Sequence, residues 1–402
     1  MKKAFISILL FYYTLHFLIP GTYFLLSGYY NLYSDVTDWP ATFKGFYLNS
    51  IMILGSILII WFLPAPKDQI RPKFYDITKL LYFALLFSVI YYIARGGFEG
   101  AISGNMGGSL MSYVNLFLKS NIILMVILFY QQKKSRPALL FFIFLIYTTL
   151  MGSRSGAISL FVIFLIYPVF TNYEQYKKQL RRVLLLFLII SPVLFIAATA
   201  LIRKADIGVD PQMILNQIAG RMSFLETCML PIHYKDIGEL NLDLFYDKYS
   251  MGHQVKLMID ALIPGNVFEY DVMPNQYYRV LFLGYSEDFI LETYTSINLT
   301  LPVYLYMYFN EFFTAVFSIA IIVGYYLLCS KCYKRAFIFL PLMASLYHLL
   351  YFFDWVMWFL IFFPSILTMV TITGFSILRK GLVDYVKIRK PVPAGPGALA
   401  KE

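Results

Sequence analysis

The stretch LMGSRSGAIS places Arg154 between Ser153 and Ser155, with apolar runs over 137–151 and 157–171 on either side. An arginine guanidinium keeps its positive charge and presents a fork of N–H donors that matches the oxygens of a phosphate. The two hydroxyls and the N–H groups of the glycine-containing turn add further donors. We therefore predict an anion site suited to phosphate here. The alternative is an arginine that only reaches lipid head groups.

A second cation, Lys119, lies inside the apolar run 112–130, between Asn115 and Asn121. A charge within a membrane-spanning helix is costly, so such residues tend to mark a substrate or ion path. We predict that Lys119 takes part in substrate binding. Because it lies about two helical turns from one end of the run, snorkelling to the membrane surface is the alternative.

The long polar segment 203–296 supplies the remaining candidates. Arg221 lies in PQMILNQIAGRMSFLETCMLPIHY, where apolar residues recur at helical spacing, so an amphipathic helix would direct it toward the membrane. His253 is the best general-base candidate by type, because the unperturbed imidazole pKa lies near neutrality. A solvated surface position is the alternative for each charged candidate in this segment, which also include Arg203, Arg279 and Glu287.

The sequence contains none of the common patterns for a metal or nucleotide site: no HExxH, no P-loop and no GxGxxG. Cys329 and Cys332 form a CxxC, but nothing nearby supplies the two further ligands of a zinc site. We therefore expect no metal and no cofactor.

The composition indicates that these residues are positioned by membrane-spanning helices. Hydrophobic residues make up 59% of the 402 residues and charged residues only 14%, with a mean hydropathy of +0.67. A soluble protein carries roughly 25% charged residues. We predict an all-α polytopic membrane protein with about ten transmembrane helices. The predicted spans are 4–26, 46–63, 76–94, 112–130, 137–151, 157–171, 183–202, 311–329, 336–353 and 356–378.

The length of the segment around Arg154 favours two crossings rather than one. A single helix over 137–171 would be about 52 Å long, against a bilayer core of about 30 Å. Two helices of about 15 residues each are short for the bilayer, so their connecting turn would lie below the membrane surface. Irregular backbone at that depth is tolerated where it lines a cavity. Arg154 is therefore predicted to point into an outward-facing cavity.

The charge distribution predicts the orientation. Of the 33 Lys and Arg residues, 22 fall on one side of the predicted topology, and segment 203–296 on the other side holds 13 of the 23 acids. Because positive loops stay in the cytoplasm, both termini are predicted to be cytoplasmic and 203–296 to be outside. The net charge of +10 then reflects membrane topology and not a nucleic-acid partner.

The chain divides into four predicted regions. N-terminal transmembrane helices occupy 1–202, and a helical outer loop or lid occupies 203–310, with a re-entrant or interfacial segment over 297–310. C-terminal transmembrane helices occupy 311–380. The remainder, 381–402, contains KPVPAGPGALAKE and is predicted to be a flexible cytoplasmic tail.

The layout, the turn TTLMGSRSGAISL, the large outer loop and LPVYLYMYFNEFF together resemble the bacterial oligosaccharide repeat-unit polymerases, the O-antigen polymerase (Wzy-type) family. The family often shows Gly-Glu before its aromatic run, whereas here Glu311 follows that run, so no role is transferred to Glu311. The resemblance implies transfer of a growing glycan from undecaprenyl pyrophosphate to the terminal sugar hydroxyl of another lipid-linked unit. This reaction takes place at the periplasmic face of the inner membrane.

The resemblance also implies roles and partners. The pyrophosphate leaving group would be held by cations and hydroxyls, and His253 or Glu287 would take the acceptor proton, with Arg221 as a further catalytic residue. The binding residues would be Arg154, Ser153, Ser155, Lys119, Arg279 and Arg203. The expected partners are lipid-linked oligosaccharides as donor and acceptor, the bilayer, and a chain-length co-polymerase; no nucleic acid is expected.

Two alternatives remain open. An O-antigen ligase or another lipid-dependent glycosyltransferase would use the same donor; the ligase takes lipid A-core as acceptor, and the sequence does not fix the acceptor. A flippase for lipid-linked oligosaccharides would be expected to show inverted repeats and short outer loops. The 94-residue segment 203–296 argues against the flippase.

Overall fold

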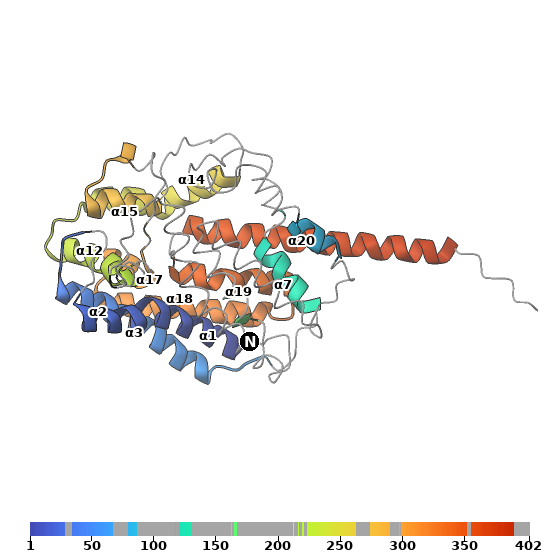
Figure 1. Ribbon diagram of the computed structural model, residues 1–402, viewed down its shortest axis with the longest axis horizontal. Coiled ribbons are helices and arrows are strands. Elements are labelled where there is room, and N and C mark those ends of the chain that lie inside the picture. Colours follow the sequence, from blue (N-terminus) through green and yellow to red (C-terminus); the bar gives the residue numbers. More distant parts are fainter. Residues whose placement is uncertain are drawn as a thin grey trace, which may run out of the picture.

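The computed structural model describes residues 1–28, 34–66, 79–86, 117, 120–130, 162, 165–166, 212, 216, 219–220, 223–262, 274–289, 297, 299–351 and 355–389. Regular structure in these ranges is helical, and none of it is a β-strand. The long helices lie side by side, with shorter helices packed at one end and along one side (Figure 1). The all-helical class predicted from the sequence is therefore confirmed for these ranges.

Within the described ranges, four segments are long and apolar enough to cross a membrane: Lys2–Ser27, Trp39–Phe62, Glu311–Cys332 and Ile361–Val383. They match four of the predicted spans, and the chain is a membrane protein by this measure. A shorter apolar helix, α19 (Ala336–Tyr351), matches a fifth. The crossings predicted over 137–151, 157–171 and 183–202 lie almost entirely outside the described residues, so the total of ten stays a prediction.

The first membrane segment contains a π-helical turn that Pro20 explains. It consists of α1 (Lys2–Tyr13), the π-helix η1 (Thr14–Leu18) and α2 (Ile19–Ser27). In an α-helix the carbonyl of His16 would bond to the amide of residue 20, but proline has no N–H. That carbonyl instead accepts a hydrogen bond from the amide of Phe224 at 3.2 Å. A residue 208 positions away thus donates a hydrogen bond to a backbone carbonyl of the first membrane segment.

The second membrane helix, α3 (Trp39–Phe62), begins seven residues before the predicted start at 46. The cause is a capping signal that hydropathy does not register. The Asp38 carboxylate accepts a hydrogen bond from the amide of Ala41 at 3.0 Å, and Pro40 lies in the first turn, where its missing N–H costs nothing. The helix therefore includes Lys44, which lies outside the span that was predicted from the apolar residues alone.

Two short helices end where α3 begins. α12 (Leu225–Asp236) starts beside His16 and finishes beside Lys44. α17 (Leu301–Tyr308) is buried over Leu301–Met307 and packs among α3, α12, α18 and α19. The Nδ2 of Asn49 donates to the Thr300 hydroxyl at 3.3 Å, while the Tyr306 hydroxyl lies 3.2 Å from Lys44. α17 therefore runs back along α3 toward its N-terminus.

The turn after α17 leads directly into α18 (Glu311–Cys332), because Asn310 caps the new helix. Its Oδ1 accepts a hydrogen bond from the amide of Phe313 at 3.0 Å. The sequence predicted one re-entrant or interfacial helix over 297–310, and the helix itself is present. Its position relative to a membrane stays a prediction. We call the end of the bundle where α3 and α18 begin the Lys44 end, and the opposite end the Lys331 end.

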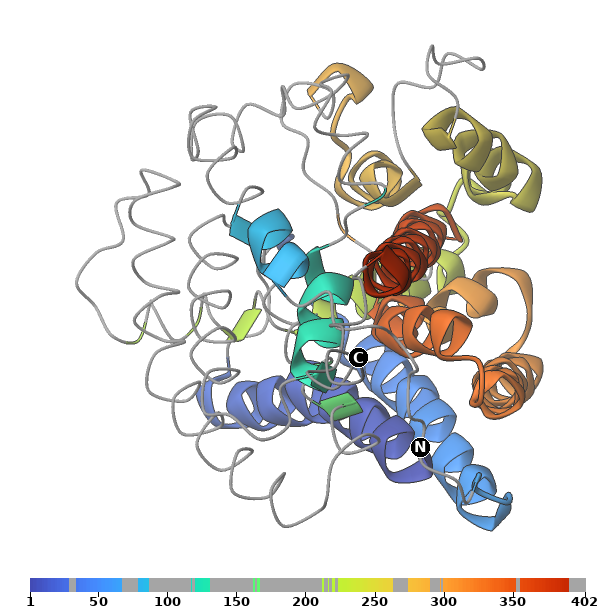
Figure 2. The same cartoon turned by 90° about the vertical axis from the view of Figure 1, so that its right-hand side faces the viewer.

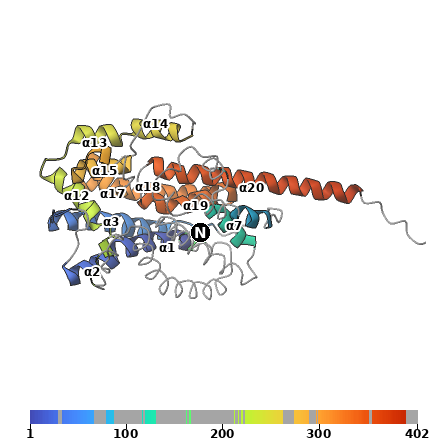
Figure 3. The ribbon, with the colours of Figure 1, turned by 45° about the horizontal axis from the view of Figure 1, so that its top comes forward.

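Three more helices follow α12: α13 (Leu242–Tyr249), α14 (Met251–Leu262) and α15 (Pro274–Leu283). Hydroxyls attach them to the bundle. Tyr278 donates to the Thr227 carbonyl at 3.0 Å, and Tyr304 donates to the Tyr249 carbonyl at 3.0 Å. Figures 1 and 3 show α12 and α15 toward the end opposite the projecting part of α20. The helical content predicted for this segment is confirmed for these four helices.

The last helix, α20 (Trp355–Arg389), is longer than any predicted span and projects beyond the other described helices (Figure 3). It packs against α19 and α14, and α7 (Ser120–Tyr130) contacts both α19 and α20. Figure 2 looks toward the projecting end, where α20 is seen along its axis. The predicted span 356–378 therefore continues as helix for eleven more residues, through Gly381, and the helix ends at Arg389, two residues before Pro391.

Candidate functional site

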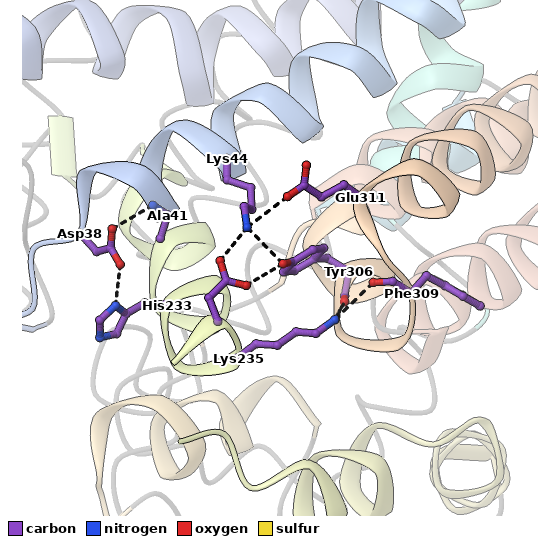
Figure 4. Close-up of polar contacts among 9 residues, drawn as sticks. Asp38, Ala41, Lys44, His233, Lys235, Tyr306, Phe309 and Glu311 are labelled. Carbon is purple, nitrogen blue, oxygen red and sulfur yellow. Dashed lines mark hydrogen bonds and ion pairs between the residues drawn. The ribbon is translucent and has the colours of Figure 1, made fainter. Parts of the chain in front are cut away.

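At the Lys44 end, Asp38 and His233 form a hydrogen-bonded pair from two elements. The Nδ1 of His233, near the end of α12, lies 2.6 Å from the Oδ2 of Asp38 (Figure 4). The other oxygen, Oδ1, accepts from the amide of Ala41 and caps α3. One carboxylate is thus fixed by a helix terminus and holds an imidazole through its second oxygen.

This pair is accessible and polarised in the way a general base requires. The His233 side chain is 22% exposed and the Asp38 side chain 23%. The amide of Ala41 is the main cause that lowers the pKa of Asp38 from 3.8, with His233 and Lys44 adding to it and partial burial opposing it. The carboxylate is therefore ionised at neutral pH. A carboxylate can only accept hydrogen bonds, so Nδ1 of His233 is the donor to Asp38, and Nε2 is the ring nitrogen that remains for another group.

Beside this pair lies a second group, the Lys44 network, which joins four helices (Figure 4). The Nζ of Lys44 on α3 lies 2.7 Å from Oδ2 of Asp236 at the end of α12 and 3.1 Å from Oε1 of Glu311 at the start of α18. Tyr306 on α17 donates from its hydroxyl to Oδ1 of Asp236 at 2.6 Å. The network holds the ends of these four helices in one arrangement.

Lys235 completes the network at the end of α17. Its Nζ donates to the carbonyls of Tyr306 and of Phe309, the latter at 3.3 Å, and lies 4.2 Å from the centre of the Tyr306 ring. Cations are stabilised at a helix C-terminus, where the last carbonyls have no intrahelical partner. Partial burial lowers the pKa of Lys235, although the neighbouring Asp236 opposes this effect.

The charges of the Lys44 network balance each other, which limits its chemistry. Two cations, Lys44 and Lys235, face two carboxylates, Asp236 and Glu311. Such a group does not attract a phosphate, because each cation already has oxygen acceptors. Its contribution is structural: it fixes α12 relative to α3, and therefore fixes His233 relative to Asp38.

Three residues predicted from the sequence lie on described helices of segment 203–296, and the structure places none of them in hydrogen-bond contact with the Asp38–His233 pair. His253 lies on α14 and is 8% exposed. Burial, followed by the nearby Lys248, lowers the pKa of His253. The guanidinium carbon of Arg279 lies 5.6 Å from the centre of the Tyr285 ring. Glu287 is exposed and lies close to the Tyr277 hydroxyl.

The other predicted site residues fall outside the described residues, so their predicted roles are untested. They are Arg154, Ser153, Ser155, Lys119, Arg203 and Arg221. In the part of the chain that the structure describes, no group of three or more His, Cys, Asp or Glu residues could hold a metal ion.

The sequence analysis missed Asp38, Lys44, His233 and Asp236 as site residues. Asp38 carried a readable signal, since Asp followed by Trp-Pro at the start of an apolar run predicts a helix cap. Lys44 carried another, because it lies one turn inside that helix. The pairing with His233 and Asp236 had no such signal, because these residues are more than 190 positions further along the chain.

Comparison of the chain with protein-family models, with curated proteins and with solved structures found no match.

Proposed function

We propose that the protein is a membrane glycosyltransferase that polymerises undecaprenyl-pyrophosphate-linked repeat units of a bacterial surface polysaccharide, such as O-antigen. The observation that carries the proposal is the Asp38–His233 pair at the end of a bundle of apolar helices. A partly exposed imidazole held by an ionised carboxylate is suited to removing a proton from a hydroxyl. Because the pair lies at the end of the apolar helices, the hydroxyl in this proposal is that of a sugar presented at the membrane surface.

In the proposed reaction, Nε2 of His233 takes the proton from the terminal sugar hydroxyl of the acceptor unit. The hydroxyl oxygen forms a bond to the anomeric carbon of the donor glycan, and the bond from that carbon to the pyrophosphate oxygen breaks. Asp38 stabilises the imidazolium that forms. The lipid pyrophosphate leaves as an anion, and the proton on His233 is afterwards released to water.

The pyrophosphate would be held by the cations and hydroxyls predicted from the sequence: Arg154, Ser153, Ser155, Lys119, Arg203 and Arg279. Arginine suits this role because its fork of donors matches two phosphate oxygens and its charge stabilises the leaving group. Arg221, His253 and Glu287 remain candidates for further catalytic roles. No nucleotide sugar is required, because the lipid pyrophosphate is already an activated donor.

We also propose that the Lys44 end faces the periplasm of a bacterial inner membrane and that both termini are cytoplasmic. Exposed basic residues at the opposite end, Lys331, Lys334 and Arg335, support this orientation. In this arrangement α12 and α17 rise toward the periplasmic surface, with α17 as the re-entrant helix. The ten spans and the lid over 203–310 belong to this proposal.

The test uses purified full-length protein in detergent with lipid-linked repeat units alone, and the products are separated on a glycan gel. A ladder of products is expected without nucleotide, metal or lipid A-core. His233→Gln is expected to abolish the ladder, and His253→Gln tests the other candidate base separately. A ladder from His233→Gln at the wild-type rate would rule out the proposed base.

The alternatives give different results in the same assay. Product that forms only after lipid A-core is added would identify a ligase. No product in either case, together with movement of lipid-linked substrate across liposomes, would identify a flippase. Arg154→Ala tests the anion site separately, with loss of the ladder expected at normal protein levels in the membrane.

A further inference from the structure

Four buried side chains on α3 and α18 each have a polar atom without a hydrogen-bond partner in the part of the chain that the structure describes. These atoms are the Oδ1 of Asn49 and the hydroxyls of Ser56, Thr314 and Ser318. All four residues are 0% exposed. A polar group buried in this way costs free energy unless something supplies the missing hydrogen bond. These atoms therefore require a further partner.

Other hydroxyls on the long apolar helices are satisfied by their own backbone. The side chain donates to the carbonyl four residues earlier at Thr42, Ser50, Ser345, Ser365, Thr368, Thr371 and Thr373. This is a common way for serine and threonine to be accommodated inside a helix. The hydroxyls of Ser56, Thr314 and Ser318 do not make this bond, so they remain available to another group.

The unpaired hydroxyls lie on one side of the contact between α3 and α18. The two helices run in the same direction, because both begin at the Lys44 end. They meet at Gly55 and Ile319, where a Cβ on Gly55 would lie 2.7 Å from the Ile319 Cδ1. Ser56 follows Gly55 and Ser318 precedes Ile319. At about 100° of rotation per residue, both hydroxyls turn to the same side of this contact, and Thr314 lies one turn before Ser318.

The start of α17 lies on that same side. Asn49 lies two turns before Ser56 on one face of α3, and its Nδ2 donates to the Thr300 hydroxyl at 3.3 Å. Thr300 occupies the N-cap position of α17, but its side chain does not cap the helix. Pro302 has no N–H, and the other first-turn amides have no side-chain cap.

The N–H groups at the start of α17 point toward the two serine hydroxyls. α17 runs toward the Lys44 end, so its first amides are directed the other way, into the bundle. In that direction Ser56 lies about 10 Å beyond Asn49 along α3, and Ser318 lies near the same depth as Ser56. The group therefore combines the positive end of a helix with hydroxyls and with one acceptor, the Asn49 Oδ1.

We propose that ordered water molecules lie between α3, α18 and the first turn of α17, bonded to Asn49, Ser56, Thr314 and Ser318. Water suits this group because it donates to the Asn49 oxygen and also accepts from amides and hydroxyls. An ion does not suit it, because these four side chains carry no charge and burying a lone charge is far more costly. The water completes the hydrogen bonding at the start of α17, and this proposal does not depend on the glycan reaction.

The first test removes a hydroxyl without changing the shape of the side chain. Thr314→Val is compared with wild type by the equilibrium constant of unfolding, using full-length protein in detergent. The variant is expected to raise this constant about fivefold, because the hydrogen bond to water is lost. A variant more stable than wild type would show that the hydroxyl had no partner and would overturn the proposal. Thr371→Val is the matched control and should change little, since its hydroxyl donates to its own helix at 2.8 Å.

X-ray radiolysis tests the water directly, because a short pulse turns water into hydroxyl radicals that oxidise the nearest side chains. Cys228 and Cys329 are both 0% exposed. The Sγ of Cys228 lies 3.7 Å from the Asn49 Nδ2 and 3.5 Å from the Thr300 hydroxyl, whereas Cys329 lies toward the Lys331 end of α18. Mass spectrometry is expected to show Cys228 oxidised several times faster than Cys329. Equal rates would contradict the proposal.

A change of salt distinguishes water from an ion. Replacing sodium by choline, or chloride by gluconate, is expected to leave the stability difference between wild type and Thr314→Val unchanged. A difference that disappears without sodium or without chloride would mean that an ion binds at these side chains, and the assignment to water would be wrong.

Discussion

The carboxylate of Asp38 accepts the Nδ1–H of His233 on one oxygen, at 2.6 Å, and the amide of Ala41 on the other, at 3.0 Å. The same side chain therefore ends a helix and orients an imidazole. These two roles respond differently to substitution, because an amide can cap a helix as well as a carboxylate but cannot stabilise an imidazolium.

Asp38→Asn is expected to lower the proposed glycan transfer at least about 100-fold while changing the free energy of unfolding by only a few tenths of a kcal/mol. The Asn oxygen can still cap α3, but the amide no longer holds His233 in the tautomer that exposes Nε2 as acceptor. Initial rates of ladder formation and thermal unfolding of the same preparations check both parts.

Asp38→Ala is the matched comparison, because it removes the cap as well. Its stability is expected to fall by about 1 kcal/mol, with activity at least as low as that of Asp38→Asn. An Asp38→Asn protein that transfers glycan at the wild-type rate would remove the carboxylate from the mechanism.

Within the Lys44 network, the Lys44 side chain should be coupled more strongly to Asp236 than to Glu311. Lys44 lies closer to Asp236 than to Glu311, and Asp236 is the less exposed of the two acids. Double-mutant cycles built from Lys44→Met with Asp236→Asn and with Glu311→Gln are expected to give coupling energies of about 1 and about 0.5 kcal/mol. Both should shrink at high salt.

Chemical unfolding of the single and double variants provides these values. Lys256→Met, which removes an exposed lysine of α14, controls for the loss of a positive charge. Equal coupling to both acids, or coupling that is insensitive to salt, would contradict the geometry.

Close helix packing at two glycines gives a third prediction. A Cβ on Gly45 would lie 2.8 Å from the Cβ of Cys228, whereas a Cβ on Gly55 would lie 2.7 Å from the Cδ1 of Ile319, the far end of a flexible side chain. Gly45→Ala is therefore expected to cost about 1–3 kcal/mol, and Gly55→Ala less. Thermal unfolding of both variants checks this order.

The two glycines should also differ in their effect on activity. Gly45→Ala must move α12 away from α3, and these helices carry the two halves of the Asp38–His233 pair, so transfer should fall. Cys228→Ala should not restore it, because alanine keeps the Cβ. Ile319→Val should relieve Gly55→Ala, since valine lacks Cδ1. Full rescue of Gly45→Ala by Cys228→Ala would show that another contact is responsible.

The fourth prediction concerns the pH dependence of stability at His253. Burial first, then Lys248 and Lys256, lower the folded pKa of His253 below 6.5, and Asp247 opposes this. At pH values between the folded pKa of His253 and 6.5, the unfolded chain binds more protons than the folded protein. The contribution of His253 to the free energy of unfolding is therefore fully present above pH 6.5 and is lost as the pH falls below that value.

The difference in free energy of unfolding between wild type and His253→Gln isolates this contribution. Measured from about pH 7.5 to about pH 5, the advantage of the wild type is expected to decline on the acid side of 6.5. An advantage that grows toward acid pH would mean that His253 is protonated in the folded protein.

Hydropathy predicted the long helices well because an apolar run long enough to cross a bilayer is visible in consecutive residues of the sequence. The first span, predicted over 4–26, is helical from Lys2 to Ser27. Where a boundary was missed, as at the start of α3, the deciding signal was the Asp38 side chain, which does not enter a hydropathy average. Position 46 marked the start of the apolar run and not the start of the helix.

The candidate site was harder to predict because its contacts join distant segments. The sequence singled out His253 as the general-base candidate, whereas in the structure it is His233 whose Nδ1 lies 2.6 Å from a carboxylate oxygen, that of Asp38. Two histidines twenty positions apart, one on α12 and one on α14, differ through their tertiary partners. No spacing rule connects Asp38 to a residue 195 positions later.

The hydrogen bond between Phe224 and His16 has a consequence for biogenesis. Ribosomes add about 5–20 residues per second, so roughly 10–40 s pass between the synthesis of Pro20 and that of Phe224. Throughout this interval the His16 carbonyl lacks the hydrogen bond that the Phe224 amide donates to it in the folded protein. The contact that ties the first membrane segment to the start of α12 therefore forms only after 208 further residues have followed His16.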